Sequence, residues 1–312
     1  MDMPWPALRS LHEFARLGTI AAVAEARGYT PGAVSQQLAT LERAVGQPLL
    51  DRVGRRLQLT DAGVVLVEHA ERILRSEDAA RHALEAVVGE VAGTIRLATF
   101  ASSAATLLAP SIVAATARHP RLTALTIEVD VDAVTHVVER GDADLAFGLD
   151  YPDAPVPRAP GIDVLRVATE RFGLAVPHAW RMPGAVSLAD AAELDWILPP
   201  ADTNYGRAVR AACRRAAFEP RVTHSVTDTA VSLAMVAQGL GITLVTDMML
   251  ALARPAGLRI LRLREEVRRD VVLVRRRGDD ARPAVAAMTA VIKEVVGAAV
   301  ARTPATLDSR RS

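Results

Sequence analysis

Residues 20–63 read IAAVAEARGYTPGAVSQQLATLERAVGQPLLDRVGRRLQLTDAG, and this stretch decides the fold of the N-terminal part of the chain. Its hydrophobic periodicity predicts helices over residues 20–26 and 30–45, joined by the three residues Arg27-Gly28-Tyr29. So short a connection with a central glycine is typical of a tight helix–helix turn. Thr30 is placed to cap the second helix, whose first turn contains a proline. We therefore predict a helix-turn-helix.

The two faces of the second helix differ in chemistry. One face carries aliphatic side chains at helical spacing, namely Val34, Leu38, Leu41 and Val45. The other carries uncharged hydrogen-bonding side chains, namely Ser35, Gln36, Gln37 and Thr40. Amide and hydroxyl groups donate and accept hydrogen bonds, which suits the reading of base edges in a major groove. This face therefore favours a DNA-recognition helix.

A short β-hairpin is expected after this helix, with its tip at Val53-Gly54-Arg55. It brings together three arginines, Arg52, Arg55 and Arg56, which only Asp51 opposes. Such a cationic wing could bind phosphates beside the groove. Judged on these residues alone, a plain three-helix unit with solvated arginines remains an equal alternative.

The same region resembles the winged helix-turn-helix of the LysR-type transcriptional regulators. The matching motifs are A-V-S-Q-Q-L-x-x-L-E (Ala33 to Glu42), Val45-Gly46, Pro48-Leu49-Leu50-x-Arg52 and Arg55-Arg56-x-x-x-Leu59-Thr60-x-Ala62-Gly63. The resemblance implies that base edges are read by Pro31, Gly32, Ser35 and Gln36. It implies that Thr30, Gln37, Arg52, Arg55 and Arg56 contact the DNA backbone or hold the register. Pro31-Gly32 replaces the more usual Gln-Pro of the family, so the operator sequence does not transfer.

One long helix is predicted over residues 61–89, which contain no proline and no internal glycine after Gly63. Its seam alternates at spacings of 4 and 3 and is broken by Glu77; the seam residues are Leu66, Ala70, Ile73, Ala80, Leu84 and Val87. A narrow heptad seam indicates pairing with a second copy, while packing on its own chain is the alternative. The resemblance agrees with pairing, which implies a roughly palindromic operator.

Strands and helices alternate from Gly93 onward and predict an α/β fold with parallel sheets. The pattern repeats after a proline-rich linker at residues 150–161, so two lobes are expected. The resemblance here is to the family's effector-binding half, which is built like a periplasmic binding protein, and is clearest at Val236-Ala237-x-Gly239-Leu240-Gly241-Ile242. The expected domains are a winged helix-turn-helix (1–60), a linker helix (61–90), a two-lobed effector domain (91–301; lobe I 91–160 and 270–301, lobe II 161–269) and a disordered tail (302–312).

A ligand is expected in the cleft between the lobes, at the carboxyl ends of the strands. Ser102 and Ser103 open a helix in the first lobe, and Thr203 and Asn204 do so in the second. Hydroxyls and free N–H groups at helix starts attract anions, so we expect a small anionic effector. Simple capping is the alternative for these four residues. The resemblance favours Ser102 and Thr203 as the main contacts; lesser wall contacts are expected from Phe100, Phe147 and Thr246.

Several classes of protein are excluded. The net charge of +1 excludes a globally basic nucleic-acid coat. The single cysteine, Cys213, allows no internal disulfide and no multi-cysteine metal site; it is a packed thiol or, beside two arginines, a redox sensor. The sequence has no P-loop, no G-x-S-x-G and no HExxH, so no enzyme, cofactor or metal is predicted. Without a signal peptide or a long apolar run, a cytoplasmic protein with no membrane contact is expected.

The sequence thus predicts an all-α winged helix-turn-helix and a linker helix, followed by a two-lobed α/β effector domain. The predicted function is that of a transcriptional regulator that binds double-stranded promoter DNA as a homodimer or homotetramer, controlled by a small-molecule effector. The alternative is a cytoplasmic small-molecule-binding protein, or an enzyme of binding-protein fold, whose N-terminal helices serve only for assembly.

Overall fold

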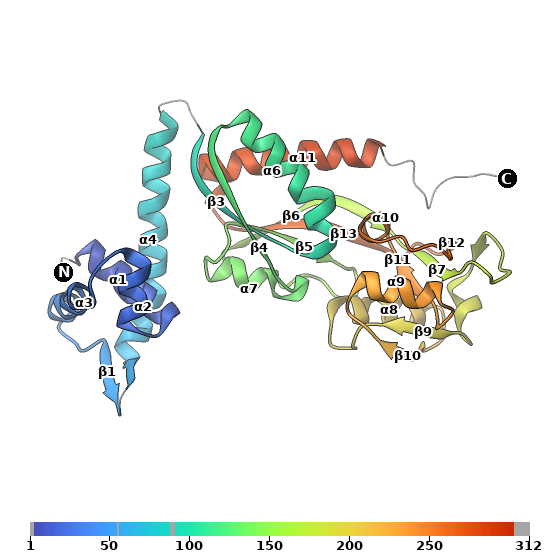
Figure 1. Ribbon diagram of the computed structural model, residues 1–312, viewed down its shortest axis with the longest axis horizontal. Helices are drawn as coiled ribbons and strands as arrows, with labels where there is room; N and C mark the ends of the chain where they lie inside the picture. Colours follow the sequence, from blue (N-terminus) through green and yellow to red (C-terminus); the bar gives the residue numbers. More distant parts are fainter. Residues whose placement is uncertain (1–2, 55, 88–90, 303–312) are drawn as a thin grey trace. The chain divides into compact units, whose positions relative to one another are not determined.

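The structure is a computed structural model of the 312-residue chain and describes residues 3–54, 56–87 and 91–302. It divides into two compact units, Met1–Leu84 and Glu85–Ser312. Figure 1 shows the helices and strands of both units.

The N-terminal unit is a winged helix-turn-helix, as predicted. Its elements are α1 (Trp5–Leu17), α2 (Ile20–Arg27), α3 (Pro31–Val45), the antiparallel hairpin of β1 (Leu50–Val53) and β2 (Arg56–Leu59), and α4 (Asp61–Val87). One hydrophobic core joins them; its most buried large side chains are Leu8, Leu11, Phe14, Val23, Val34, Leu38, Leu41 and Leu49. The aliphatic face of α3 therefore points inward, and its amide and hydroxyl face points to solvent.

The start of the wing is fixed by four hydrogen bonds and one close backbone approach. The Glu42 carboxylate, in α3, accepts hydrogen bonds from the backbone N–H groups of Leu49 (2.9 Å) and Leu50 (3.1 Å). The Thr60 hydroxyl donates to the Pro48 carbonyl at 2.8 Å and accepts from the Gly63 N–H at 3.0 Å. A Cβ at Gly63 would lie only 2.2 Å from the Leu49 carbonyl oxygen, so no larger residue fits there. These contacts hold the wing against α3 and the start of α4.

The two halves of helix α4 lie in different environments. Its first half packs in the core of its own unit, where Ala70 is fully buried and Leu74 nearly so. Glu77, which breaks the predicted seam, forms an ion pair of 2.7 Å with Arg9 of α1. Leu84, further along, is 72% exposed. Packing on its own chain thus accounts for the first half, and pairing with a second copy stays a prediction for the second.

The first lobe is built on a five-stranded sheet in the order β4-β3-β5-β13-β6. Its strands are β3 (Ala92–Thr99), β4 (Arg121–Glu128), β5 (Leu145–Asp150), β6 (Ile162–Arg171) and β13 (Arg268–Arg276). Helices α6 (Ala109–Arg118) and α11 (Pro283–Arg302) cover one face, and α7 (Val134–Glu139) covers the other (Figure 1). The prediction of a parallel sheet was wrong for β13, which is antiparallel to both its neighbours. It enters from the second lobe, opposite to β5, and so runs the other way.

The boundary predicted between the lobes at residue 161 also needs correction. Residues 162–171 form β6, which pairs with β13 in the first lobe's sheet. The chain crosses to the second lobe only at Phe172 and returns at Val267, where the Phe172 N–H donates to the Val267 carbonyl at 2.8 Å. The proline-rich segment after β5 runs back along the first lobe, because β6 must start at the far end of the sheet.

The second lobe contains a mixed four-stranded sheet in the order β11-β7-β12-β8, and a parallel pair, β9 and β10. Its strands are β7 (Gly173–Pro177), β8 (Ala185–Val186), β9 (Asp195–Leu198), β10 (Arg221–Ser225), β11 (Thr243–Val245) and β12 (Leu258–Leu263). Its helices are α8 (Asn204–Arg215), α9 (Thr229–Ala237) and α10 (Asp247–Leu252). Two crossings between two α/β lobes confirm the expected binding-protein-like architecture.

The helix that Ser102 and Ser103 were predicted to open begins at Ala101 and is not uniform. It starts as α5 (Ala101–Ser103), widens into a π-helical turn at Ala104–Leu108 and continues as α6. In the wide turn the Ala109 N–H donates to the Ala104 carbonyl. Pro110 follows and has no N–H to donate, so the regular ladder is interrupted there in any case. The π-helical turn therefore directly follows Ser102 and Ser103.

Candidate nucleic-acid interface and effector cleft

The solvent face of α3 presents the residues predicted to read bases. Thr30, Pro31, Gly32, Ser35 and Gln36 are all exposed. The Thr30 hydroxyl caps the helix by accepting from the Ala33 N–H at 3.2 Å. Within the described residues, no hydrogen bond engages the Ser35 hydroxyl or the Gln36 amide. These two side chains are therefore free to bind base edges.

Gln37 has a different environment from its neighbours. Its side-chain oxygen accepts a hydrogen bond of 2.6 Å from the hydroxyl of Ser10, which is fully buried in α1. This bond ties the recognition helix to α1. Two roles were predicted for Gln37, contact with the DNA backbone and holding the register. The bond to Ser10 favours the second.

The wing carries its arginines outward. Arg52 and Arg56 are exposed on β1 and β2, and in the part of the chain that the structure describes neither side chain forms an ion pair. Arg55 lies outside the described residues. Unpaired guanidinium groups beside a helix with an amide face form the usual arrangement for phosphate contacts.

Sequence reasoning missed a further cationic position, at the turn before α3. The guanidinium group of Arg27 lies 5.4 Å from the centre of the Tyr29 ring, and Tyr29 is 41% exposed. A basic residue two positions before an aromatic one, just ahead of the recognition helix, was the available signal.

The two first-lobe serines behave differently. Ser103 is fully buried; its hydroxyl donates to the Phe100 carbonyl at 2.9 Å and lies 2.7 Å from the Thr99 hydroxyl. It thus serves the local structure, as the capping alternative predicted. Ser102 is 6% exposed, and its hydroxyl has no hydrogen-bond partner among the described residues. Only Ser102 of the pair has a side chain free to bind a ligand.

The start of α8 in the second lobe is already occupied. The Thr203 hydroxyl accepts from the Gly206 N–H at 3.0 Å and donates to the Pro200 carbonyl at 2.8 Å, so it caps the helix. The side-chain oxygen of Asn204 accepts from Arg207. The Asn204 backbone N–H donates to a carboxylate oxygen of Asp132 at 2.8 Å. The N–H that we expected to bind an anionic ligand therefore holds a carboxylate of the protein itself.

Asp132 comes from the first lobe, in the 3-10 turn Val131–Ala133 that precedes α7, so its bond to Asn204 links the two lobes. Its other oxygen, Oδ1, is buried and has no partner among the described residues. Burial raises the pKa of the Asp132 carboxyl above its ordinary value, an effect that the Asn204 N–H partly offsets. Asp132 thus holds one buried acceptor that a hydrogen-bond donor on a ligand could satisfy. The acidic pair Asp130 and Asp132, after a strand, was a signal that sequence reasoning passed over.

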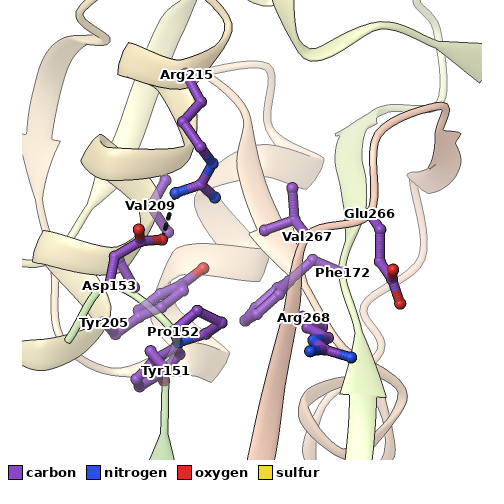
Figure 2. A pocket seen from close by; sticks show the side chains of 11 residues that line it. Tyr151, Pro152, Asp153, Phe172, Tyr205, Val209, Arg215, Glu266, Val267 and Arg268 are labelled. Atoms are coloured by element: carbon purple, nitrogen blue, oxygen red, sulfur yellow. Dashed lines mark hydrogen bonds and ion pairs between the residues drawn. The ribbon is translucent and has the colours of Figure 1, made fainter. Parts of the chain in front are cut away.

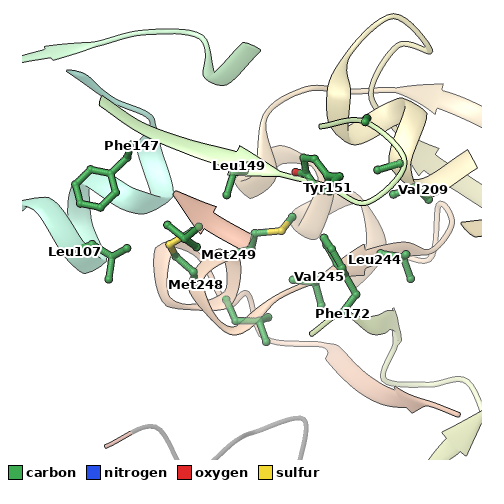
Figure 3. Packing of buried hydrophobic residues seen from close by; sticks show 14 of the residues in the cluster. Leu107, Phe147, Leu149, Tyr151, Phe172, Val209, Leu244, Val245, Met248 and Met249 are labelled. Atoms are coloured by element: carbon green, nitrogen blue, oxygen red, sulfur yellow. The ribbon is translucent and has the colours of Figure 1, made fainter. Parts of the chain in front are cut away.

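Two of the three expected wall contacts lie in the interior. Phe147 is 1% exposed, lies within β5 and shares the core with Leu107 (Figure 3). Thr246 is fully buried, and its hydroxyl accepts from the Arg269 guanidinium at 2.8 Å. A ligand in the cleft cannot reach either residue without repacking the core, so we leave both out of the site. Phe100 is half-buried at the start of α5 and stays a candidate.

A buried ion pair fixes the crossing between the lobes. Arg269, 3% exposed, donates to Glu170 at 2.8 Å, and its guanidinium group lies 5.5 Å from the centre of the Phe172 ring. The other Glu170 oxygen accepts from the Met248 N–H, at the start of α10, at 3.0 Å. Both crossing segments and one helix of the second lobe therefore meet at a single buried charge pair.

Three further features concern redox chemistry, metal binding and membrane insertion. Cys213 is fully buried in α8, and burial raises the pKa of its thiol to about 12, which favours the packed thiol over the redox sensor. In the described ranges, no three His, Cys, Asp or Glu side chains are grouped to hold a metal ion. No helix of the described chain has both the length and the apolar character needed to cross a membrane.

Comparisons with known proteins agree with this geometry. Residues 5–64 match the family described as bacterial regulatory helix-turn-helix protein, lysR family, and residues 89–297 match the LysR substrate binding domain. The regulator ShiR of Corynebacterium glutamicum is 29% identical over 231 residues, which are 70% of this chain and 74% of that protein. The regulator TfdS of Cupriavidus pinatubonensis is 28% identical over 267 residues, 81% of this chain and 85% of that protein.

Two solved structures share the fold. Full-length CbnR in complex with its target DNA has a TM-score of 0.60 at 23% identity, covering 94% of this chain and 100% of that one. A full-length OxyR variant from Pseudomonas aeruginosa has a TM-score of 0.73 at 16% identity, covering 95% of each chain. At these identities the likeness supports the fold alone.

Proposed function

The chain belongs to the LysR family of bacterial regulatory proteins, and we propose that it binds promoter DNA through the exposed face of α3 and the wing arginines. The observation that carries this proposal is that Ser35, Gln36, Arg52 and Arg56 are exposed and uncommitted on a unit that is otherwise well packed. Groups that read bases and groups that bind phosphates thus lie on neighbouring elements.

A second copy completes this interface. The exposed Leu84 on the second half of α4 supports a homodimer through the linker helix. Two recognition helices would then face two half-sites of one operator, and a pair of dimers would form the homotetramer. The proposal covers a regulator that acts in the cytoplasm and catalyses no reaction.

The effector would bind in the cleft between the lobes, against Ser102 and the start of α8. A ligand can change DNA binding only if it prefers one arrangement of the lobes over another. The bond from Asn204 to Asp132 spans the lobes and is the contact that such a ligand would replace or reinforce. An anionic effector has to displace the Asp132 carboxylate from the Asn204 N–H.

Replacing Arg52 and Arg56 with alanine tests the DNA interface. If each contacts one phosphate, the slope of log affinity against log salt should fall by about 0.9 per arginine, or about 2 together. Binding of the full chain to the DNA upstream of its own gene is measured by fluorescence anisotropy at several salt concentrations. Arg16→Ala, which removes an exposed arginine of α1, is the control for the loss of a surface arginine elsewhere in the unit and should leave the slope unchanged.

A second variant, Gln36→Ala, separates the recognition of bases from the binding of phosphates. It should weaken binding to the upstream site by about 1–3 kcal/mol while leaving binding to random DNA unchanged. An unchanged salt slope in the arginine variant, together with unchanged site preference in Gln36→Ala, would overturn the proposed interface.

Ser102 tests the effector cleft. A panel of organic acids, amino acids and amines is screened for compounds that raise the melting temperature of the wild-type chain. Ser102→Ala should weaken binding of a compound so found by about 0.5–1.5 kcal/mol, the net contribution of one neutral hydrogen bond, and should leave DNA affinity unchanged.

Thr203 provides the companion variants of this test. Thr203→Ala loses the cap of α8 and should also lower stability by about 1 kcal/mol, whereas Thr203→Ser keeps the hydroxyl and should behave like the wild type. Unaltered titration curves for Ser102→Ala and Thr203→Ala would remove both residues from the site.

A further inference from the structure

A second cavity, outside the proposed effector cleft, lies where the chain crosses between the lobes. It has a volume of about 160 Å³ and is bounded by the loop after β5, one flank of α8 and the two crossing segments (Figure 2). None of the seven residues predicted for the effector lines it. Along α8 it extends from Tyr205, the neighbour of the Asn204 that binds Asp132, to Arg215 at the far end of the helix.

The inner wall of this cavity is aromatic. The Tyr205 ring stacks between the Phe172 ring, at 5.8 Å and 11° between planes, and the Tyr151 ring, at 6.3 Å and 27°. The Tyr205 hydroxyl donates to the Leu244 carbonyl at 2.6 Å, so its polar end is already satisfied. Ala208, Val209 and Val267 complete the apolar lining. Such a wall accepts a flat apolar body and offers it few hydrogen bonds.

The rim of the cavity is charged and, among the residues that the structure describes, has one cation without an ion-pair partner. Arg215 pairs with Asp153, and Glu266 lies 3.6 Å from Arg171. Arg268, on the remaining side, is exposed, and no ion pair or hydrogen bond engages its side chain within the described residues. A free guanidinium group at the mouth of an apolar cavity selects an anionic group on the ligand, and a carboxylate suits its fork of donors.

We propose that this cavity is a second small-molecule site, which takes a single-ring aromatic carboxylate with its ring against Phe172 and Tyr205 and its carboxylate at Arg268. The size agrees, because an apolar protein cavity of about 150 Å³ holds one benzene ring. A molecule bound there touches α8 and both crossing segments, the elements between which the lobes must turn. It would therefore act on the same two-lobed unit as the effector, through contacts that do not include Ser102 or Thr203.

The test uses 4-fluorobenzoate as the probe and the full-length chain, with binding followed by the ¹⁹F NMR signal. The wild type should show saturable binding. Ala208→Leu fills the cavity without removing a polar group and should abolish that binding. Arg268→Ala should weaken it about tenfold or more, because a charge-assisted hydrogen bond is lost. Arg264→Ala removes an exposed arginine from the same segment, outside the cavity, and should leave the affinity unchanged.

A competitor and a further variant define the ligand and the place. Cyclohexanecarboxylate, which has the charge but not the flat ring, should displace 4-fluorobenzoate less effectively than unlabelled benzoate does. Ser102→Ala should bind 4-fluorobenzoate like the wild type. The proposal is overturned if the wild type shows no saturable binding, or if Arg264→Ala loses as much affinity as Arg268→Ala. It is also overturned if Ser102→Ala loses binding while Ala208→Leu keeps it, because the probe then occupies the cleft. None of these results bears on DNA binding, so the proposed DNA-binding function is tested independently of this site.

Discussion

Replacing Arg269 with leucine is expected to lower the free energy of unfolding of the two-lobed unit by about 3–5 kcal/mol. Arg269 is 3% exposed, and its partner Glu170 has a side chain only 13% exposed. Removing one member of a buried ion pair leaves the other charge without compensation in a medium that solvates it poorly. Among the described residues, the Glu170 carboxylate would keep the Met248 N–H as its one hydrogen-bond donor. The cost therefore comes mainly from the carboxylate left behind, and less from the attraction that is lost.

The double variant Arg269→Leu/Glu170→Leu distinguishes these two contributions. With both charges removed, the loss should be clearly smaller than the sum of the two single losses, so the cycle should show strong coupling. Urea unfolding in a Trp5→Phe background follows Trp180 and Trp196, which both lie in this unit. The control is Arg221→Leu, which removes one side of the exposed pair with Asp195 and should cost less than about 1 kcal/mol. Equal losses for Arg221→Leu and Arg269→Leu would contradict the account.

The N-terminal unit could be predicted from the sequence because its determinants are local. The turn, the cap and the two-faced helix lie within about one helix length of each other, and the structure has each of them. The motif positions outside α3 also acquire physical reasons. Glu42 holds the first N–H groups of the wing, and Gly63 leaves room for the Leu49 carbonyl. Each contact joins residues at most 14 positions apart, which a short motif can encode.

The effector half was predicted less completely because its determinants are distant in sequence. Asp132 meets Asn204 across 72 positions, and Glu170 meets Arg269 across 99. The hydrophobic periodicity of the sequence gives no information about pairings between such distant residues. The error at β6 has the same origin: its partner β13 lies about a hundred residues further on, so the lobe to which it belongs depends on a pairing that local pattern does not show.

Phe147 illustrates a different limit. A position near the carboxyl end of a strand is the right place for a ligand contact in an open sheet. Whether its side chain points to the cleft or to the core depends on which face of the sheet it takes. In this strand residues 145–149 are all buried, because helices cover both faces of the sheet. A strand that is apolar throughout carries no alternation from which the face can be read.

The same reasoning about buried charge leads to an expected loss of about 3–5 kcal/mol for Asp144→Asn, in the first lobe. The Asp144 carboxylate accepts from Arg282 at 2.6 Å, from Arg276 at 3.2 Å and from the Arg96 backbone N–H at 2.8 Å. Both guanidinium groups have side chains only 10% exposed. An asparagine keeps the shape but removes one of the two carboxylates that face these cations. Asp279, 2.9 Å from Arg276 and 3.6 Å from Arg282, remains, so two buried guanidinium groups would share one carboxylate. Asp142→Asn, which breaks the exposed contact with Arg140, is the matched control and should change stability by less than about 1 kcal/mol.

The pH dependence of this loss identifies its cause. Burial alone would raise the pKa of Asp144, but the charges and hydrogen bonds of Arg282, the Arg96 N–H and the charge of Arg276 outweigh it, so its pKa lies below the ordinary value. In the unfolded chain the pKa of an aspartate is about 3.9. The stabilisation by Asp144 is therefore complete above about pH 4 and is lost as the pH falls through the lower pKa of the folded state. The difference in unfolding free energy between the wild type and Asp144→Asn should be largest near neutral pH and shrink from about pH 4 downward. A difference that stays constant from neutral pH to about pH 2 would mean that packing, and not the charge of Asp144, holds this end of the sheet.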